Sequence, residues 1–196
     1  MRHLVLWSGG PDSTLSLKDV LTQTNDPVVA LHVSLKFYTE PGRMPKWQYE
    51  LGLVKTLYPM MQKMFRPFEL ITNEFKIDHC VISDILIMVP FAAGACNYYK
   101  DIGKIWTGDD SVQDDGMMDN ALKSAIQLCI FGHRHPKTNL NIDYHPKPGT
   151  NRSKQKIRED LGEELWNTAI SCRQPYIDGS VCGECESCKE RLTTHA

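Results

Sequence analysis

Four cysteines near the end of the chain have the spacing of metal ligands. Cys182, Cys185 and Cys188 follow one another at intervals of three residues, and Cys172 lies upstream of them. A Cys-x-x-Cys turn aims two thiolates at one ion, and Gly183 eases that turn. Four sulfurs would make a closed tetrahedral zinc site with a structural role, because no position is left for water. An iron–sulfur site and a disulfide or redox pair are the alternatives, with zinc favoured.

A second chemical feature lies at the start of the chain, in Ser8-Gly9-Gly10-Pro11-Asp12-Ser13. A short apolar run over 3–7 precedes it and suits a buried strand, and residues 13–21 have the apolar spacing of a helix. Adjacent glycines free the backbone to turn its N–H groups toward one point, and a helix N-terminus adds positive charge. Strand, glycine-rich loop and helix together predict an anion site, to which three hydroxyls could contribute: Ser8, Ser13 and Thr14. The alternative is a Ser/Gly turn that only caps a helix.

Composition restricts the class of protein. The chain has 196 residues, 41% hydrophobic and 23% charged residues and a net charge of −2. These values suit one globular domain. The small net charge creates no overall electrostatic attraction to nucleic acid or to a membrane surface. No apolar run approaches a membrane span, and the apolar start is too short for a signal peptide. We therefore expect a soluble, cytoplasmic protein.

The remaining pattern predicts the elements that position these two features. Strands are expected over 3–7, 27–35, 68–77, 104–107 and about 140–144, and helices over 13–21, 46–65, 91–100, 119–131 and 153–166. Pro59 should break or kink the second of these helices, and a turn is expected at 88–90, before a helix that begins after Pro90. Alternating strands and helices predict an α/β fold with a doubly wound, mostly parallel sheet.

Both ends of the chain resemble known proteins. SGGPDS resembles the SGGxDS loop of the PP-loop ATP pyrophosphatases, and the tail, SC-x9-CGECESCKERL, resembles that of the 7-cyano-7-deazaguanine synthase family. The resemblance implies an adenine nucleotide alpha hydrolase-like fold. It places a nucleotide-binding domain at 1–150 and the C-terminal helix with the cysteine tail at 151–196, both within one compact domain. It also implies a zinc knot, with Arg191 at the position of the arginine that follows it, and a possible homodimer.

The implied chemistry uses ATP and Mg²⁺. ATP would transfer AMP to 7-carboxy-7-deazaguanine, ammonia would convert the adenylate to an amide, and a second ATP would convert the amide to a nitrile. The expected nucleotide-binding residues are Ser8, Gly9, Gly10, Asp12, Ser13, Thr14, Gly108 and Asp110. Ser8, Asp12, Ser13 and Lys154 would act in catalysis, Asp12 or Asp110 helping to bind Mg²⁺ through water. A solvated helix face is the alternative for Lys154.

The middle of the chain departs from that family. Val89-Pro90 is followed by Phe91-Ala92-Ala93-Gly94, where the family usually has VPxRN, and a G-x-N-x-x-D turn is represented only by 108–111. This part helps to build the substrate pocket. The alternatives are therefore another PP-loop adenylating enzyme, which amidates a different carboxylate or thiolates tRNA, and a non-catalytic nucleotide- and zinc-binding module. The sequence shows neither an appended domain nor an excess of basic residues, either of which would favour direct nucleic-acid binding.

Overall fold

The computed structural model describes residues 1–36, 40–76, 84–108, 143–145 and 153–193. The elements in chain order are β1 Arg2–Leu6, α1 Pro11–Gln23, β2 Val28–Lys36, α2 Lys46–Met64, β3 Glu69–Lys76, α3 Asp84–Tyr99, β4 Ile102–Trp106, β5 Asp143–His145, α5 Lys154–Leu161, α6 Glu163–Thr168 and α7 Glu186–Thr193. The predicted helix over 119–131 lies outside the described residues, and β5 overlaps the strand expected near 140–144.

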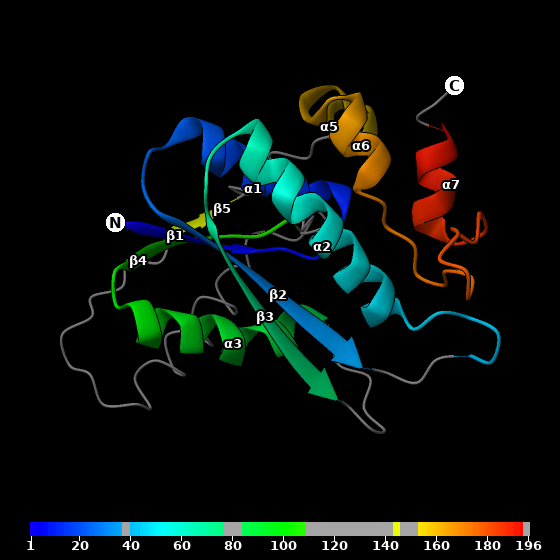
Figure 1. Ribbon diagram of the computed structural model, residues 1–196, viewed down its shortest axis with the longest axis horizontal. Helices are drawn as coiled ribbons and strands as arrows, with labels where there is room; N and C mark the ends of the chain where they lie inside the picture. The colour runs from blue at the N-terminus through cyan, green and yellow to red at the C-terminus, as the bar shows by residue number, and fades with distance from the viewer. Residues whose placement is uncertain (37–39, 77–83, 109–142, 146–152, 194–196) are drawn as a thin grey trace.

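The sheet has five strands in the order β3-β2-β1-β4-β5 (Figure 1). Each pair of neighbouring strands is parallel, as predicted for a doubly wound α/β fold. The strand order reverses at β1, which has β2 on one side and β4 on the other. In open α/β sheets such a switch point leaves a crevice at the carboxyl ends of the strands. The loop after β1 begins at that edge.

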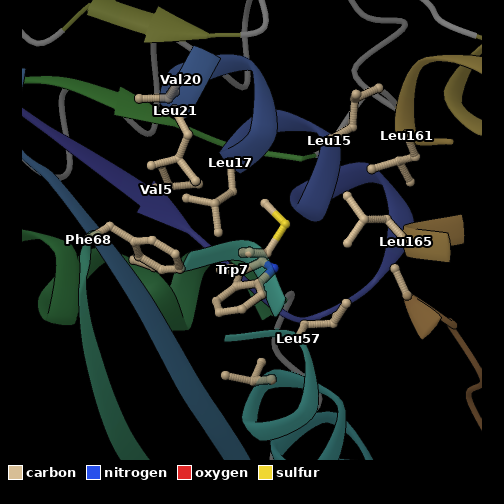
Figure 2. Packing of buried hydrophobic residues seen from close by; sticks show 14 of the residues in the cluster. Val5, Trp7, Leu15, Leu17, Val20, Leu21, Leu57, Phe68, Leu161 and Leu165 are labelled. Atoms are coloured by element: carbon tan, nitrogen blue, oxygen red, sulfur yellow. The ribbon is translucent and has the colours of Figure 1, made fainter. Parts of the chain in front are cut away.

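Successive side chains of the central strands point to opposite faces of the sheet, which divides the core into two layers. Leu4 and Leu31 belong to the layer packed against α3, while Val5 and Ala30 belong to the layer beneath α1, α2, α5 and α6. Figure 2 shows the second layer, where Trp7 lies among aliphatic side chains from several helices. Burial on both faces explains the continuous apolar runs of β1 and β2.

The predicted turn at 88–90 is wrong, and Pro59 does not break its helix. Helix α2 continues through Pro59, and α3 continues through Pro90, where we predicted a turn at 88–90. A proline inside a helix costs about 3 kcal/mol, because it removes one hydrogen bond and crowds the preceding turn. Burial of apolar side chains on both sides of each proline offsets that cost. In α2, Leu57 and Met61 are completely buried.

The predicted helix over 153–166 is two helices, and a later one was not predicted. Gly162, at φ +81°, ends α5 and forms the N-cap of α6, in a conformation that suits glycine. Helix α7 follows the cysteines and carries Cys188. Within the described ranges, no helix combines the length and apolar character needed to cross a bilayer.

Candidate functional site: the phosphate loop and the cysteine cluster

The glycine-rich loop joins β1 directly to α1. Gly10 is the N-cap of α1 and Pro11 is its first residue, a position where proline is tolerated. Gly9 adopts φ +82°, and a Cβ atom there would lie 3.1 Å from Leu53 Cβ and 3.2 Å from Val54 Cγ2. Glycine is therefore favoured both by the backbone conformation and by the close approach of α2. The predicted strand, loop and helix are confirmed.

Two of the three predicted hydroxyls face one another within the loop. The Oγ atoms of Ser8 and Ser13 are 3.0 Å apart, and the backbone N–H of Ser8 donates to Ser13 Oγ at 3.2 Å. Ser13 Oγ donates to the carbonyl of Gly10 at 3.2 Å. Thr14 is fully buried, and its Oγ1 accepts a hydrogen bond from Trp7 Nε1 at 3.0 Å. The Thr14 hydroxyl therefore supports the loop from the core side.

The first turns of α1 and α5 meet through an ion pair. Lys154 Nζ donates to both carboxylate oxygens of Asp12, at 2.7 and 2.8 Å, although the two residues are 142 positions apart in the sequence. Ser153 caps α5, since its Oγ accepts the backbone N–H of Lys156 at 3.2 Å. The side chains remain 35% and 25% exposed, for Lys154 and Asp12, so the pair is accessible to a ligand. The fold thus brings Lys154 to the phosphate loop.

Gly108 approaches the same helix terminus from β4. A Cβ atom at Gly108 would lie 2.3 Å from the backbone nitrogen of Ser13, which leaves space only for glycine. The carbonyl of Thr107 accepts a hydrogen bond from Ser16 Oγ at 2.9 Å, which fixes the end of β4 against α1. Gly108 is therefore part of the loop's surroundings, while the predicted Asp110 lies outside the described residues.

A small hollow, open to solvent, lies beside this ion pair. Its lining comes from the loop region and from the C-terminal elements: Pro11, Asp12, Lys154, Trp166, Ser171, Ser187, Glu190 and Arg191. Ser171 Cβ would be 3.8 Å from a Cβ atom placed on Gly10. Sequence analysis missed Trp166, Ser171, Ser187 and Glu190 as candidates. The only sequence signal was their proximity along the chain to the cysteines.

The four predicted cysteines converge. Their Sγ atoms all lie within 4.8 Å of one another, and Cys172, Cys182 and Cys188 are buried. Cys172 Sγ and Cys182 Sγ are 3.6 Å apart, and Cys182 Sγ and Cys188 Sγ are 3.9 Å apart. Backbone N–H groups of Cys182 and Cys185 donate to neighbouring sulfurs, at 3.4 and 3.3 Å. The cluster could hold a metal ion.

The spacing of the sulfurs suits one ion at their centre. Zn–S bonds of about 2.3 Å in a tetrahedron place the sulfurs about 3.8 Å apart. The two sulfur separations of 3.6 and 3.9 Å lie on either side of that value. An iron–sulfur cluster is held at the outer corners of a larger body, so its ligands stand farther apart. These two separations are compatible with a single tetrahedral ion.

The surroundings shift the thiols of the cluster in opposite directions, because burial raises the pKa of Cys172, and that of Cys188 to about 12, whereas the pKa of Cys182 is lowered. Burial opposes ionisation of the Cys182 thiol, but hydrogen bonds from the backbone of Cys185 and Glu184 outweigh it and lower the pKa of Cys182. Burial raises the pKa of Tyr49 to about 12, and nearby Cys172 and Cys188 add to that shift. Tyr49 therefore stays neutral and packs against the cluster as part of its apolar wall.

A buried histidine supports the strand end before the loop. His32 is 1% exposed, and its Nδ1 lies 3.0 Å from the carbonyl oxygen of Trp7. Its Nε2 lies 3.2 Å from Ser34 Oγ. Burial lowers the pKa of His32, which favours the neutral ring. A neutral ring with its proton on Nδ1 donates to Trp7 and accepts from Ser34. His32 was not among the sequence-predicted residues.

No family model matches the chain. No curated protein matches it either. Among solved structures, the U34-tRNA thiolase NcsA from Methanococcus maripaludis, with its [4Fe-4S] cluster, is similar at a TM-score of 0.53 and 14% identity. That match covers 99% of this chain and 63% of the thiolase. A protein from the universal stress protein family from Burkholderia pseudomallei has a TM-score of 0.40 and 14% identity, over 74% of this chain and 96% of that one. The likeness to NcsA shows a shared α/β fold.

Proposed function

We propose that the protein is a PP-loop enzyme that adenylates a carboxylate at the expense of ATP. The observation that carries this proposal is the phosphate loop itself: Ser8 to Ser13 at the sheet's switch point, with Lys154 beside it. A helix N-terminus, adjacent serine hydroxyls and an accessible ammonium together suit a pyrophosphate group. The resemblance of SGGPDS to the SGGxDS loop of the PP-loop ATP pyrophosphatases supports ATP over other phosphate compounds.

Each residue then has a defined part in the transfer. The backbone N–H groups at the start of α1 and the hydroxyls of Ser8 and Ser13 hold the β- and γ-phosphates. Lys154 leaves Asp12 and neutralises the charge that develops on pyrophosphate as the bond between the α- and β-phosphates breaks. Asp12, released from Lys154, helps to hold Mg²⁺ through water.

The acceptor that best fits both ends of the chain is 7-carboxy-7-deazaguanine. Its carboxylate oxygen attacks the α-phosphorus, and pyrophosphate leaves. Ammonia attacks the acyl carbon and AMP leaves with the oxygen, which gives the amide. A second ATP adenylates the amide oxygen, and loss of AMP and a proton gives the nitrile. No protein nucleophile is needed, because ammonia supplies the nitrogen.

Zinc is the proposed metal of the cysteine cluster. Four ligands close its coordination shell, so the ion holds the tail together and takes no part in the transfer. The 3.6 and 3.9 Å sulfur separations and the backbone N–H···S bonds support this choice.

A second candidate keeps the adenylation and changes the acceptor. NcsA is named as a tRNA thiolase and is solved with a [4Fe-4S] cluster, and its fold is similar to this one. If the present protein thiolated tRNA, the cysteines would be expected to bind an iron–sulfur cluster. Metal analysis and the visible absorption spectrum of protein purified without oxygen would distinguish the two candidates. Bound zinc without visible absorption supports the first candidate, and bound iron with visible absorption supports the second.

The experiment that tests the proposal is pyrophosphate release from ATP. It is measured with and without 7-carboxy-7-deazaguanine and ammonium, and the organic products are followed by mass. We expect release that depends on the acid, followed by a nitrile product. Release with tRNA or with another carboxylate, but not with this acid, would keep the adenylation and replace the acceptor. No release with any acceptor would contradict the enzyme proposal.

A further inference from the structure

Helix α7 connects the cysteine cluster to the hollow beside the phosphate loop. It carries Cys188, which is 4% exposed, and Arg191 one turn later. Arg191 lines the hollow together with Asp12 and Lys154. One short helix thus holds a thiol of the metal cluster and a side chain at the candidate nucleotide site.

Arg191 is attached to the end of α6 by three interactions. Its Nη2 donates to the carbonyl oxygen of Trp166 at 2.7 Å, and its Nη1 donates to that of Ala169 at 3.4 Å. Its guanidinium carbon lies 4.6 Å from the centre of the Trp166 ring. Carbonyls at a helix C-terminus lack intrahelical partners and attract a cation. Arg191 therefore determines how α7 sits against α6.

Trp166 links Arg191 to the hydrophobic core. It is 1% exposed and packs in the same cluster as Leu15 of α1 and Leu161 of α5. These two helices begin with the residues that form the ion pair, Asp12 and Lys154. Ser171, next to Cys172, also lies against Gly10 of the loop. Displacement of α7 would uncover Trp166 and open the wall of the hollow.

We infer that Arg191 is a positioning residue that couples metal occupancy of the cysteine cluster to nucleotide binding at the phosphate loop. The inference rests on the proposed function in one respect, that the loop binds the phosphates of ATP. An ion on Cys188 fixes α7, and Arg191 then fixes the end of α6 and the wall of the hollow. Because binding equilibria are linked reciprocally, bound nucleotide also tightens metal binding, which we expect to observe as slower metal release.

The test follows metal release from intact, metal-loaded protein. A chromogenic chelator in excess reports the release rate, with and without Mg²⁺ and α,β-methylene-ATP, an analogue that cannot be cleaved between its α- and β-phosphates. Binding of the analogue is measured separately by calorimetry. In the unmodified protein we expect the analogue to slow release about tenfold, a typical size for coupling between two sites.

Three variants separate coupling from simple stabilisation. Arg191→Gln should release metal faster, and the analogue should slow its release less than twofold. Arg191→Lys should behave in the same way, because an ammonium cannot span two carbonyls as the planar guanidinium does. Lys189→Gln, which removes the same charge from an exposed position of α7, should keep the full effect. A titration of the metal-loaded chelator with the analogue, without protein, corrects for metal taken up by the analogue itself.

Two outcomes would overturn the inference. The first is analogue binding without any change in the metal release rate of the unmodified protein, which leaves the proposed function intact. The second is an Arg191→Gln variant that binds the analogue and keeps the tenfold effect. Failure of the unmodified protein to bind the analogue would contradict the proposed function and the coupling together, and calorimetry identifies that case directly.

Discussion

At the scale of single residues, the ion pair of Asp12 and Lys154 provides a cation that a ligand can take over. Both side chains are partly exposed, and Lys154 donates to both carboxylate oxygens. An exposed pair contributes little to stability, because water competes for both groups. We therefore expect Lys154 to matter for chemistry more than for folding.

Substitution Lys154→Gln tests this expectation. It should lower kcat/KM for pyrophosphate release roughly 100-fold, the usual effect of losing one group that stabilises a transition state. The midpoint of urea unfolding should change little. Lys55→Gln, at an exposed position of α2, removes the same charge away from the loop and should leave the rate within about twofold. Equal rates for the two variants would remove Lys154 from the catalytic set.

A pH dependence of stability also belongs to this scale. Burial lowers the pKa of His32, and burial of His3 does the same despite the nearby Asp26 carboxylate. In the unfolded chain both rings titrate near 6.5, so the unfolded state binds more protons below that pH. The free energy of unfolding should therefore fall as pH decreases below about 6.5, by up to about 1.4 kcal/mol per pH unit for each ring.

The measurement is urea unfolding at several pH values between about 5 and 8. His32→Asn should reduce the slope of stability against pH, because one of the two titrating rings is gone. The slope of stability against pH that remains in His32→Asn then reports chiefly on the titration of His3. An unchanged slope in His32→Asn would contradict the assignment of a lowered pKa to His32.

At the scale of elements, the loop and α2 are fitted to each other through Gly9. Its positive φ makes any side chain there strained, and the 3.1 Å approach of Leu53 Cβ would force α2 to shift slightly. Sequence patterns identified the strand, loop and helix correctly, because apolar spacing and adjacent glycines are local signals. They did not identify α2 as the helix that covers the loop, since that contact depends on the path of the chain between β2 and β3.

Two glycine substitutions compare these effects. Gly9→Ala should destabilise the protein by at least about 1–2 kcal/mol, because alanine is strained at φ +82°. Gly52→Ala lies in α2 with nothing within 4 Å of its Cβ position, and should stabilise by up to about 1 kcal/mol. Urea unfolding gives both values. A neutral Gly9→Ala variant would mean that the loop can relax away from α2.

At the scale of the whole molecule, the cysteine cluster fastens the C-terminal elements to the rest. Cys172 follows α6, Cys188 belongs to α7, and Tyr49 of α2 packs against them. The tail has few apolar residues, so we expect a metal bound by the cysteines to be the main source of its stability. Arg43 adds a contact by packing 4.2 Å from the centre of the Tyr176 ring.

Removal of the metal should lower the stability of the whole protein. A metal present at 1,000 times its dissociation constant contributes about 4 kcal/mol, which a strong chelator would abolish. Thermal unfolding should then occur at a lower temperature, and added zinc should restore the original value. The same chelator saturated with zinc serves as the control. An unchanged unfolding temperature after complete removal of metal would contradict the structural role.

The sequence by itself determined the features that depend on near neighbours. An apolar run followed by adjacent glycines predicted the strand, loop and helix at the start of the chain, the short spacing of Cys182, Cys185 and Cys188 predicted three members of the cysteine cluster, and alternation of strands and helices predicted the parallel sheet. The local rule for a turn failed before Pro90, and Pro59 does not break α2, because the burial that keeps those helices continuous comes from the sheet beneath them.

Tertiary structure alone decided which distant residues meet. Lys154 pairs with Asp12 across 142 positions, and Ser171 lies against Gly10, since α5 and α6 pack over α1. Arg191 reaches the end of α6 only because the cysteine cluster folds α7 back along it. Such contacts follow from the packing of apolar helix faces on one sheet, which joins residues irrespective of their separation along the chain.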